Sequence, residues 1–314
     1  ASLGRVPVIS HASTSPTLQE KGTYGYFSRT IPSDSVTALA AAQTCFHFKF
    51  NNVALMYVDD LYGGGYAQKF SEFAATGATD GRAVRIVTIN SFKRGDKASI
   101  EAAIAGIAAS KTRIIVCVVY SEDLQATLDA ADEAGITAQK GYAWITADNL
   151  ISAPEWTLTT EFPERYARLL GGWMPVVTHI SQERRDLFQA EKAKVPLVEV
   201  RQPNNLITED ELRGECNDQC FYVYDAVWAA AGAVCAAAVE AGTVGVPVKP
   251  LGSDVLRTLH SQTMLGSSGT VSFDPDGERS SSSIAMSVKN LVFDKEFGRL
   301  SLVDLGTWEA TKGF

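Results

Sequence analysis

The sequence predicts an α/β protein built on a mainly parallel sheet whose two faces are covered by helices. Two observations predict this class. Four short apolar segments rich in Val and Ile recur between residues 53 and 146, and helical patterns separate them. Their spacing of about 30 residues is the length of a right-handed β-α-β unit. A chain of 314 residues is also long enough for two domains or lobes.

The predicted strands are continuously apolar, as is typical of strands that are buried on both faces. They are Val53–Val58, Ala83–Asn90, Arg113–Tyr120 and Tyr142–Thr146. The helices predicted between them are Gly65–Ala75, Lys97–Ser110 and Glu122–Ala134. Asp96 is a suitable N-cap for the second helix, and Gly135 is a suitable stop for the third.

Segments at both ends of the chain lie outside this alternating run. Short strands are predicted at Val6–Ser10, Tyr26–Arg29 and Val176–His179, and a polar helix at Gln182–Lys194. Between residues 269 and 308 the sequence predicts further strands separated by turns. The segment Tyr222–Ala241 carries small residues on most faces, which predicts a buried helix. Because these segments must pair with each other or with the central run, we expect two lobes between which the chain passes several times.

Composition and motifs exclude several classes of function. The net charge of −8 and the pI near 5.1 argue against nucleic acid or an anionic membrane as a partner. The longest apolar run, Ala226–Val239, is shorter than the roughly 18 residues of a membrane span. The glycines Gly63–Gly65 lack the third glycine of a dinucleotide loop, since position 68 is Gln, and no Gly-Lys-Ser/Thr follows them. We therefore expect that the chain is not an enzyme and uses no cofactor. We expect the glycines to form a turn between a strand and a helix.

The cysteines and histidines leave one question open. Cys216 and Cys220 lie close enough in sequence to form a small disulfide loop, and the same spacing fits free thiols or a metal site. The four histidines, at positions 11, 47, 179 and 260, form no cluster with ligand spacing. We expect no metal.

Polar side chains follow several of the predicted strands. In open parallel sheets the ligand lies beyond the carboxyl ends of the strands. The residues at these ends are Ser13, Thr14, Tyr62, Tyr120, Ser121 and Asp148. This rim of hydroxyls, phenols and carboxylates, without a cluster of Lys or Arg, suits a small ligand that carries an ammonium group. A charge-assisted bond to an aspartate is worth about 1.5–3 kcal/mol.

Several motifs resemble a known family. ISHASTSPTL, followed by YFSRTIPSD, resembles the ligand-binding region of class C G-protein-coupled receptors, especially metabotropic glutamate receptors. Bacterial periplasmic amino-acid-binding proteins share this pattern. YDAVWAAAGAV resembles the buried lobe 1 helix of the family, and GSSGTVSFDPDGERS its Gly-rich turn and hairpin. The resemblance implies the two-lobe type I periplasmic-binding-protein-like fold, called a Venus flytrap.

The resemblance also implies roles for single residues. Thr14 matches the threonine that binds the ligand α-carboxylate, with Ser13 beside it, and Asp34 matches an aspartate near the α-ammonium. Tyr62 matches a tyrosine that closes from the second lobe, and Asp148 an aspartate of that lobe; Tyr120 and Ser121 would contribute there too. Simpler roles stay open: Asp34 as a helix cap, Thr14 and Asp148 as turn residues, and Tyr62 as a packing aromatic.

The resemblance sets the expected domain limits and function. Lobe 1 is expected at 1–34 and 180–268, without its N-terminal part, and lobe 2 at 35–179 and 269–314. We expect the extracellular ligand-binding domain of a plasma-membrane receptor, which binds an amino-acid-like ligand, signals by lobe closure and forms a homodimer or heterodimer through lobe 1. A transmembrane region is expected downstream. The alternative is a periplasmic solute-binding protein of an amino-acid ABC transporter.

Overall fold

The computed structural model describes residues 5–76, 83–147, 164–194, 201–202, 205–206, 218–242, 250–296, 299–310 and 312–314. The chain forms two compact units. Unit 1 consists of Ala1–Ala12, Tyr26–Ile31 and Ile180–Arg279, and unit 2 of Ser13–Gly25, Pro32–His179 and Ser280–Phe314.

These units differ from the expected lobes in three segments, 13–25, 32–34 and 269–279. Ser13, Thr14 and Asp34 belong to unit 2, because the helix that Asp34 begins and the segment after Thr14 both pack there. Residues 269–279 belong to unit 1, where the Arg279 guanidinium donates to the Thr30 and Thr270 carbonyl oxygens, at 2.9 Å each.

Unit 2 is built on a sheet of seven strands in the order β13-β12-β7-β6-β5-β3-β4. Neighbours from β7 to β4 pair in parallel, whereas β12 and β13 add antiparallel strands at one edge. The bounds are β3 (Asn52–Val58), β4 (Arg85–Phe92), β5 (Ile114–Val118), β6 (Ala143–Thr146), β7 (Trp173–Thr178), β12 (Ala285–Asp294) and β13 (Arg299–Glu309). The mixed α/β fold with a mainly parallel sheet is therefore confirmed.

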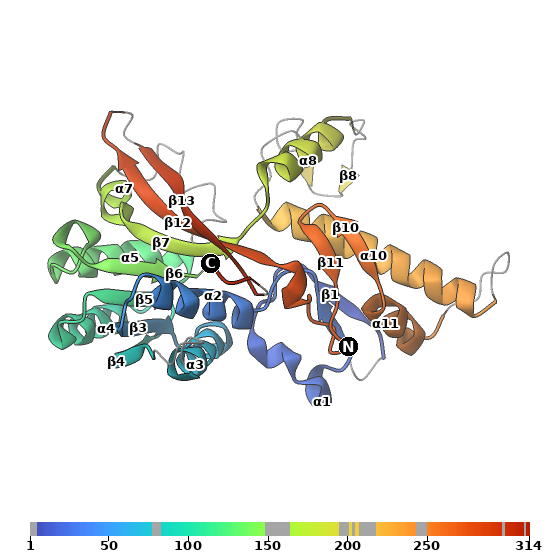
Figure 1. Cartoon of the computed structure of the whole chain (residues 1–314), viewed down its shortest axis with the longest axis horizontal. Coiled ribbons are helices and arrows are strands. Elements are labelled where there is room, and N and C mark those ends of the chain that lie inside the picture. The colour runs from blue at the N-terminus through green and yellow to red at the C-terminus, as the bar shows by residue number, and fades with distance from the viewer. Residues whose placement is uncertain are drawn as a thin grey trace. The chain divides into compact units, whose positions relative to one another are not determined.

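Helices cover both faces of this sheet (Figure 1). One face carries α2 (Asp34–His47) and α3 (Leu61–Thr76), and the other carries α4 (Lys97–Ser110), α5 (Ser121–Glu133) and α7 (Glu164–Leu170). Asp96 caps α4 as predicted, since its carboxylate accepts from the Ser99 N–H at 3.3 Å. Gly135, with φ +69°, follows the end of α5, as predicted. Four short helices also belong to the described part of the unit: η1 (Pro16–Gln19), α1 (Lys21–Tyr24), η2 (Ala138–Lys140) and η4 (Ser281–Ser283).

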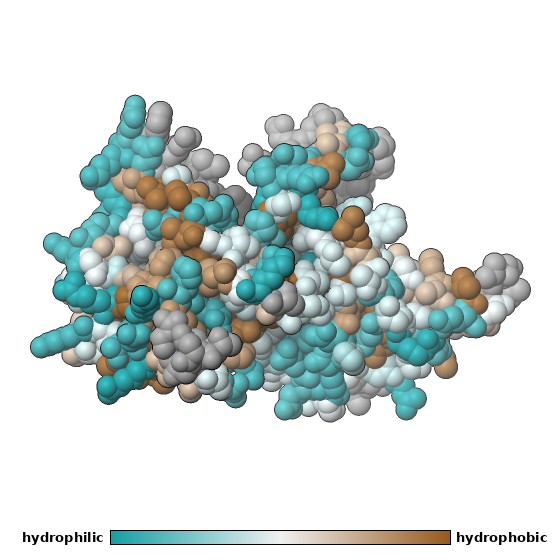
Figure 2. Space-filling view, viewed as in Figure 1, coloured by the Kyte–Doolittle hydropathy of each residue, from teal (hydrophilic) through white to brown (hydrophobic). Residues whose placement is uncertain are grey.

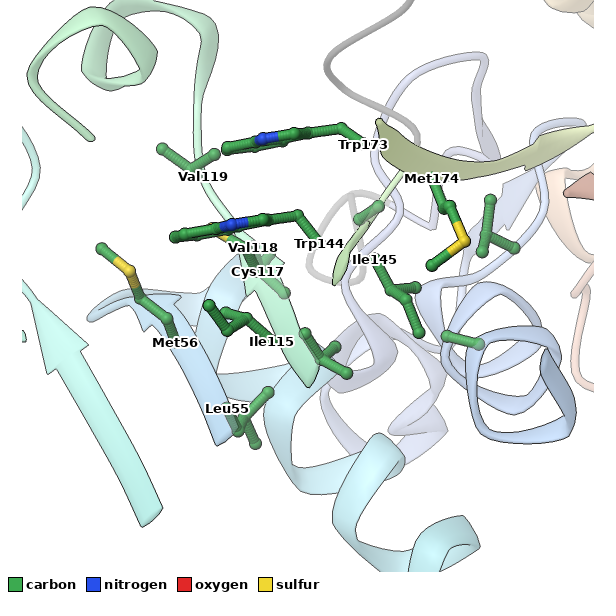
Figure 3. Close-up of a cluster of buried hydrophobic side chains, with 14 of the residues drawn as sticks. Leu55, Met56, Ile115, Cys117, Val118, Val119, Trp144, Ile145, Trp173 and Met174 are labelled. Carbon is green, nitrogen blue, oxygen red and sulfur yellow. The ribbon is translucent and has the colours of Figure 1, made fainter. Parts of the chain in front are cut away.

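The core of unit 2 lies between the sheet and its helices. The indoles of Trp144 and Trp173 stack with ring centroids 4.6 Å apart (Figure 3). Trp144 Nε1–H donates to the Ile136 carbonyl at 2.9 Å. One prediction about this sheet was wrong: β4 is not buried on both faces. It is the edge strand, so Val87 and Ile89 remain 39% and 56% exposed.

Unit 1 is smaller and holds a core of Ala229, Ala233, Leu259, Val271 and Phe273. Among its described residues the strands form three pairs: parallel β1 (Val8–Ser10) and β2 (Phe27–Arg29), antiparallel β8 (Arg201–Gln202) and β9 (Asn205–Leu206), and antiparallel β10 (Thr263–Gly266) and β11 (Gly269–Ser272). The helices described in this unit are α8 (Gln182–Lys194), α10 (Asp218–Glu240) and α11 (Gly252–His260).

The predicted burial of α10 was wrong for one side of the helix. Ala229 and Ala233 are fully buried, but Val227 and Trp228 are 63% and 57% exposed. Apolar side chains along α10 contribute brown patches in Figure 2. The helix is longer than the predicted apolar run, and by length and composition alone it could cross a membrane. It packs here on the unit 1 core, and it carries a fully buried carboxylate, Asp225.

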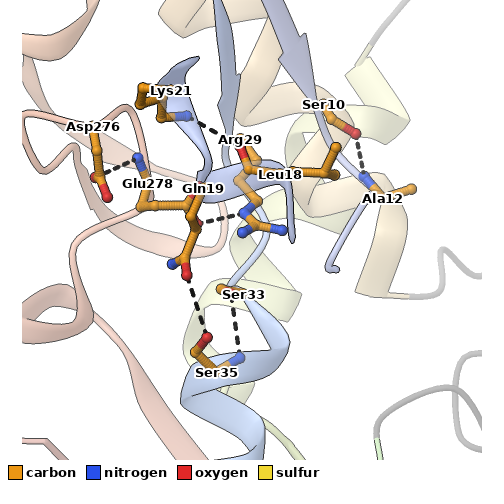
Figure 4. Close-up of polar contacts among 10 residues, drawn as sticks. All are labelled: Ser10, Ala12, Leu18, Gln19, Lys21, Arg29, Ser33, Ser35, Asp276 and Glu278. Atoms are coloured by element: carbon orange, nitrogen blue, oxygen red, sulfur yellow. Dashed lines mark hydrogen bonds and ion pairs between the residues drawn. The ribbon is translucent and has the colours of Figure 1, made fainter. Parts of the chain in front are cut away.

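Buried polar contacts tie the segments of unit 1 together. Arg29 Nε donates to Glu278 Oε2 at 2.6 Å, and both side chains are at most 5% exposed (Figure 4). The Asp225 carboxylate accepts from the backbone N–H groups of Ser267, at 2.5 Å, and Ser268, at 3.0 Å. Because charged groups are costly to bury unless they are paired, these contacts fix how the segments meet.

Candidate functional site

The candidate site lies at the carboxyl edge of the parallel strands of unit 2. The chain continues from the end of β3 into α3, from the end of β4 into the loop that contains Arg94, and from the end of β5 through Tyr120 into α5. Because β3 pairs with both β4 and β5 in parallel, these three exits lie side by side. This is the place where open parallel sheets bind ligands.

Asp60 organises the start of α3. Its Oδ1 accepts from the backbone N–H groups of Tyr62 and Gly63, each at 2.9 Å. These first-turn amides would otherwise be free to hold an anion. A carboxylate of the chain therefore occupies the place that a phosphate would need.

The glycines after Asp60 serve close packing. A Cβ at Gly63 would lie 2.0 Å from the Val58 carbonyl oxygen, and one at Gly65 would lie 2.8 Å from Pro16 Cδ. The strand turns into the helix so tightly that a side chain at either position would collide with its neighbours. The predicted strand-to-helix turn is confirmed, although α3 begins one turn earlier than predicted.

The loop around Thr14 is bonded to the starts of α2 and α3. The Asp34 N–H donates to the Thr14 carbonyl at 2.9 Å, and the Ser15 hydroxyl donates to the Leu61 carbonyl at 2.9 Å. Asp34 is not the cap of α2, because Ser33 Oγ takes that role by accepting from the Ser35 N–H at 3.2 Å (Figure 4).

The exposed fraction of the residue increases from Asp34, at the start of α2, through Thr14 to Ser13. Asp34 is only 3% exposed, Thr14 is half-buried and Ser13 is exposed. Asp34 is thus a buried carboxylate at the start of α2 that does not serve as its N-cap.

Tyr66 is a site residue that sequence reasoning missed. It lies one helical turn after Tyr62, is completely buried, and its hydroxyl has no hydrogen-bond partner among the described residues. Burial, and then the nearby charges of Asp34 and Cys45, raise the pKa of Tyr66 well above its usual range. The i, i+4 spacing of the two tyrosines was the available signal.

Two tyrosines and an arginine pack in a row beyond β3 and β5. The rings of Tyr62 and Tyr120 are 5.1 Å apart, and the Arg94 guanidinium lies 4.1 Å from the centre of the Tyr120 ring. Arg94 Nε also donates to Glu122 at 2.6 Å. Burial, and then a hydrogen bond to Asp60, raise the pKa of Tyr120 to about 12. Tyr120 therefore stays a neutral phenol at physiological pH.

The structure brings most of the predicted residues into one chain of contacts. The Thr14 carbonyl accepts from the Asp34 N–H, and the Ser15 hydroxyl donates to the carbonyl of the residue before Tyr62. The Tyr62 ring in turn packs on the Tyr120 ring. Ser121 follows Tyr120 as the first residue of α5. Asp148 and Cys216 lie outside the described residues, so the role of the first and the pairing of Cys216 with Cys220 stay predictions.

Arg94 was also missed by sequence reasoning. The prediction placed no cluster of Lys or Arg at this rim. Arg94 comes from the loop after β4, and its exposed charge is balanced by Glu122. Within the described ranges no group of three or more His, Cys, Asp or Glu side chains gathers as a metal site would need.

Comparison with known proteins gives a family match over most of the chain. Residues 1–288 match the family described as receptor family ligand binding region. Over 72 residues, 23% of this chain, the sequence is 39% identical to the probable metabotropic glutamate receptor mgl-1 of Caenorhabditis elegans. Over 147 residues, 47% of this chain, it is 26% identical to metabotropic glutamate receptor 4 of Mus musculus and of Rattus norvegicus.

These matches cover only small parts of the relatives, 7% of the nematode protein and 16% of each mammalian one. The matched family consists of receptor ligand-binding regions and is not an enzyme family. The predicted resemblance is confirmed: this chain belongs to the receptor family ligand binding region, of the type found in class C, metabotropic-glutamate-like receptors.

Proposed function

We propose that the chain is the extracellular ligand-binding domain of a membrane receptor and that it binds a small amino-acid-like ligand. The observation that carries this proposal is the contact chain from Thr14 and Asp34 to Tyr62 and Tyr120. It combines hydroxyls, a buried carboxylate and phenols, which together complement an α-amino and an α-carboxylate group. The family match and the receptor names of the curated relatives support a receptor rather than a transport protein.

Each residue has a distinct role in this proposal. The hydroxyls of Ser13 and Thr14 hold the ligand carboxylate, and Asp34 attracts the ammonium group. Tyr62 packs over the ammonium, with Tyr120 behind it at 5.1 Å. Ser121 and Asp148 complete the contacts of this rim.

Signalling follows from a shift in population. A ligand favours the conformation to which it binds more tightly, by the difference in its binding free energy between two states. We propose that the favoured state is a closed arrangement of two lobes, that a dimer transmits it, and that a transmembrane region elsewhere in the full protein receives it.

A thermal-shift screen of the twenty amino acids and γ-aminobutyrate tests the proposal. A ligand present at 100 times its dissociation constant adds about 2.7 kcal/mol of stability, which is readily measured. We expect Asp34→Asn and Tyr62→Ala to abolish the shift given by the active compound. Asp59→Asn is the matched control, since Asp59 is an exposed carboxylate beside the site. A shift that survives in Asp34→Asn would contradict the proposed roles.

A further inference from the structure

A pocket of about 570 Å³ lies at the opposite edge of the unit 2 sheet, where β3 and β5 begin. It is lined by two segments, residues 49–52 and 110–114, and by Val87 of β4. Its volume is in the range of small-molecule sites, which is roughly 300–1,000 Å³. The candidate site described above lies at the other ends of the same strands, so the two sites are separate.

The lining of this pocket is basic, although the chain as a whole has a net charge of −8. It holds three cations, Lys49, Lys111 and Arg113, and it includes no Asp or Glu. No ion pair joins any of the three cations to a carboxylate within the described part of the chain. Asn51, Asn52 and Thr112 add uncharged polar side chains to the lining, whereas the Ser110 hydroxyl already donates to the Ile107 carbonyl at 2.7 Å.

Both lysines occupy unusual backbone positions. Lys49 and Lys111 have φ of 59° and 56°, the left-handed region in which glycine is favoured and L side chains are rare. They follow the ends of α2 and α4, where a glycine would commonly stand. At both positions the chain therefore carries a positively charged side chain in a backbone conformation that favours glycine.

The helix ends do not cancel this charge. Each helix C-terminus carries roughly −0.5 of an elementary charge, so two of them offset about one of the three positive charges. Arg113 is exposed, and its guanidinium lies over one neighbour, 5.6 Å from the centre of the Tyr142 ring. The pocket thus keeps an excess of about two positive charges together with an oriented guanidinium.

We propose that this pocket binds a phosphate group, either as the free ion or on a small organic ester. A dianion matches the excess positive charge, and the guanidinium fork of Arg113 suits two oxygens of one tetrahedral group. The two lysines supply point charges from the ends of α2 and α4. This inference is independent of the amino-acid site proposed above.

Calorimetric titration of the intact chain with sodium phosphate and with glycerol 3-phosphate, at low ionic strength, tests the proposal. We expect saturable binding that weakens at least tenfold in the double variant Lys49→Gly and Lys111→Gly, and also in Arg113→Gln. Glycine suits both backbone positions, so we expect the double variant to unfold at the same temperature as the parent chain or higher. Lost binding then cannot be assigned to lost folding.

Lys97→Gln is the matched control, because Lys97 is an exposed lysine at the other end of α4. We expect it to bind phosphate like the parent chain. Tighter binding of the ester than of inorganic phosphate would assign an organic phosphate as the ligand, and equal binding would assign the free ion; either result supports the site. Absence of saturable binding by both compounds, or unchanged binding in the glycine double variant, would overturn it.

Discussion

Replacing Gly63 with alanine is expected to lower the free energy of unfolding by about 3 kcal/mol, at the upper end of what overpacking costs. The reason is a collision with backbone, since the new Cβ would lie 2.0 Å from the Val58 carbonyl oxygen and 2.8 Å from Val58 Cγ1. Neither β3 nor α3 can move away without disturbing the core that both bury. Urea denaturation followed by circular dichroism measures the change.

Gly64 provides a matched control one residue away. A Cβ at Gly64 would have no atom within 4 Å, and the residue lies inside α3. Because alanine favours helix over glycine by up to about 1 kcal/mol, Gly64→Ala should leave the protein as stable as before or more stable. Equal effects of the two substitutions would contradict the tight turn between β3 and α3.

Removing the Glu278 carboxylate from the buried ion pair of unit 1 is expected to have a comparable effect. In Glu278→Ala the Arg29 guanidinium, which is completely buried, loses the carboxylate that accepts from its Nε at 2.6 Å. Leaving one member of a buried ion pair without its partner costs about 3–5 kcal/mol. Hydrogen exchange of β2 and of the 274–279 turn, both in unit 1, would report the loss.

The double variant Arg29→Met and Glu278→Leu is the control for this prediction. It removes both charges and keeps apolar volume, so we expect it to be more stable than Glu278→Ala alone. Exchange in the β3–β5 part of unit 2 should not change in either variant. If the double variant were the less stable of the two, the charge of Arg29 would not be the cause of the loss.

The elements that the sequence predicted well are those with strong local signals. Lys97–Ser110 was predicted with its observed ends because the Asp96 cap and the apolar spacing mark it, and the polar helix Gln182–Lys194 also has its predicted ends. The start of α3 was missed by one turn, since its three glycines conceal a helix that Asp60 caps. The exposed side of α10 was missed for another reason. Its apolar residues indicate burial, but only tertiary packing determines which of them are covered.

The candidate site was predictable only in part. Strand ends and family resemblance indicated Thr14, Asp34, Tyr62 and Tyr120, and these do fall into one chain of contacts. Arg94 could not be placed from sequence, because its partner Glu122 and the ring of Tyr120 come from a separate segment, 26 or more residues further along the chain. Contacts between such distant segments depend on the order of strands in the sheet.

The most direct test of the central claim is a calorimetric comparison of two forms of one ligand. The amino acid that gives the largest thermal shift is titrated into the protein, and its N-acetyl derivative, which lacks the ammonium charge, is titrated in parallel. We predict saturable binding of the free amino acid, at least a tenfold weaker response to the N-acetyl form, and the same weakening for the free amino acid in Asp34→Asn. Equal binding of both forms, or full binding by Asp34→Asn, would show that this site does not recognise an α-amino group.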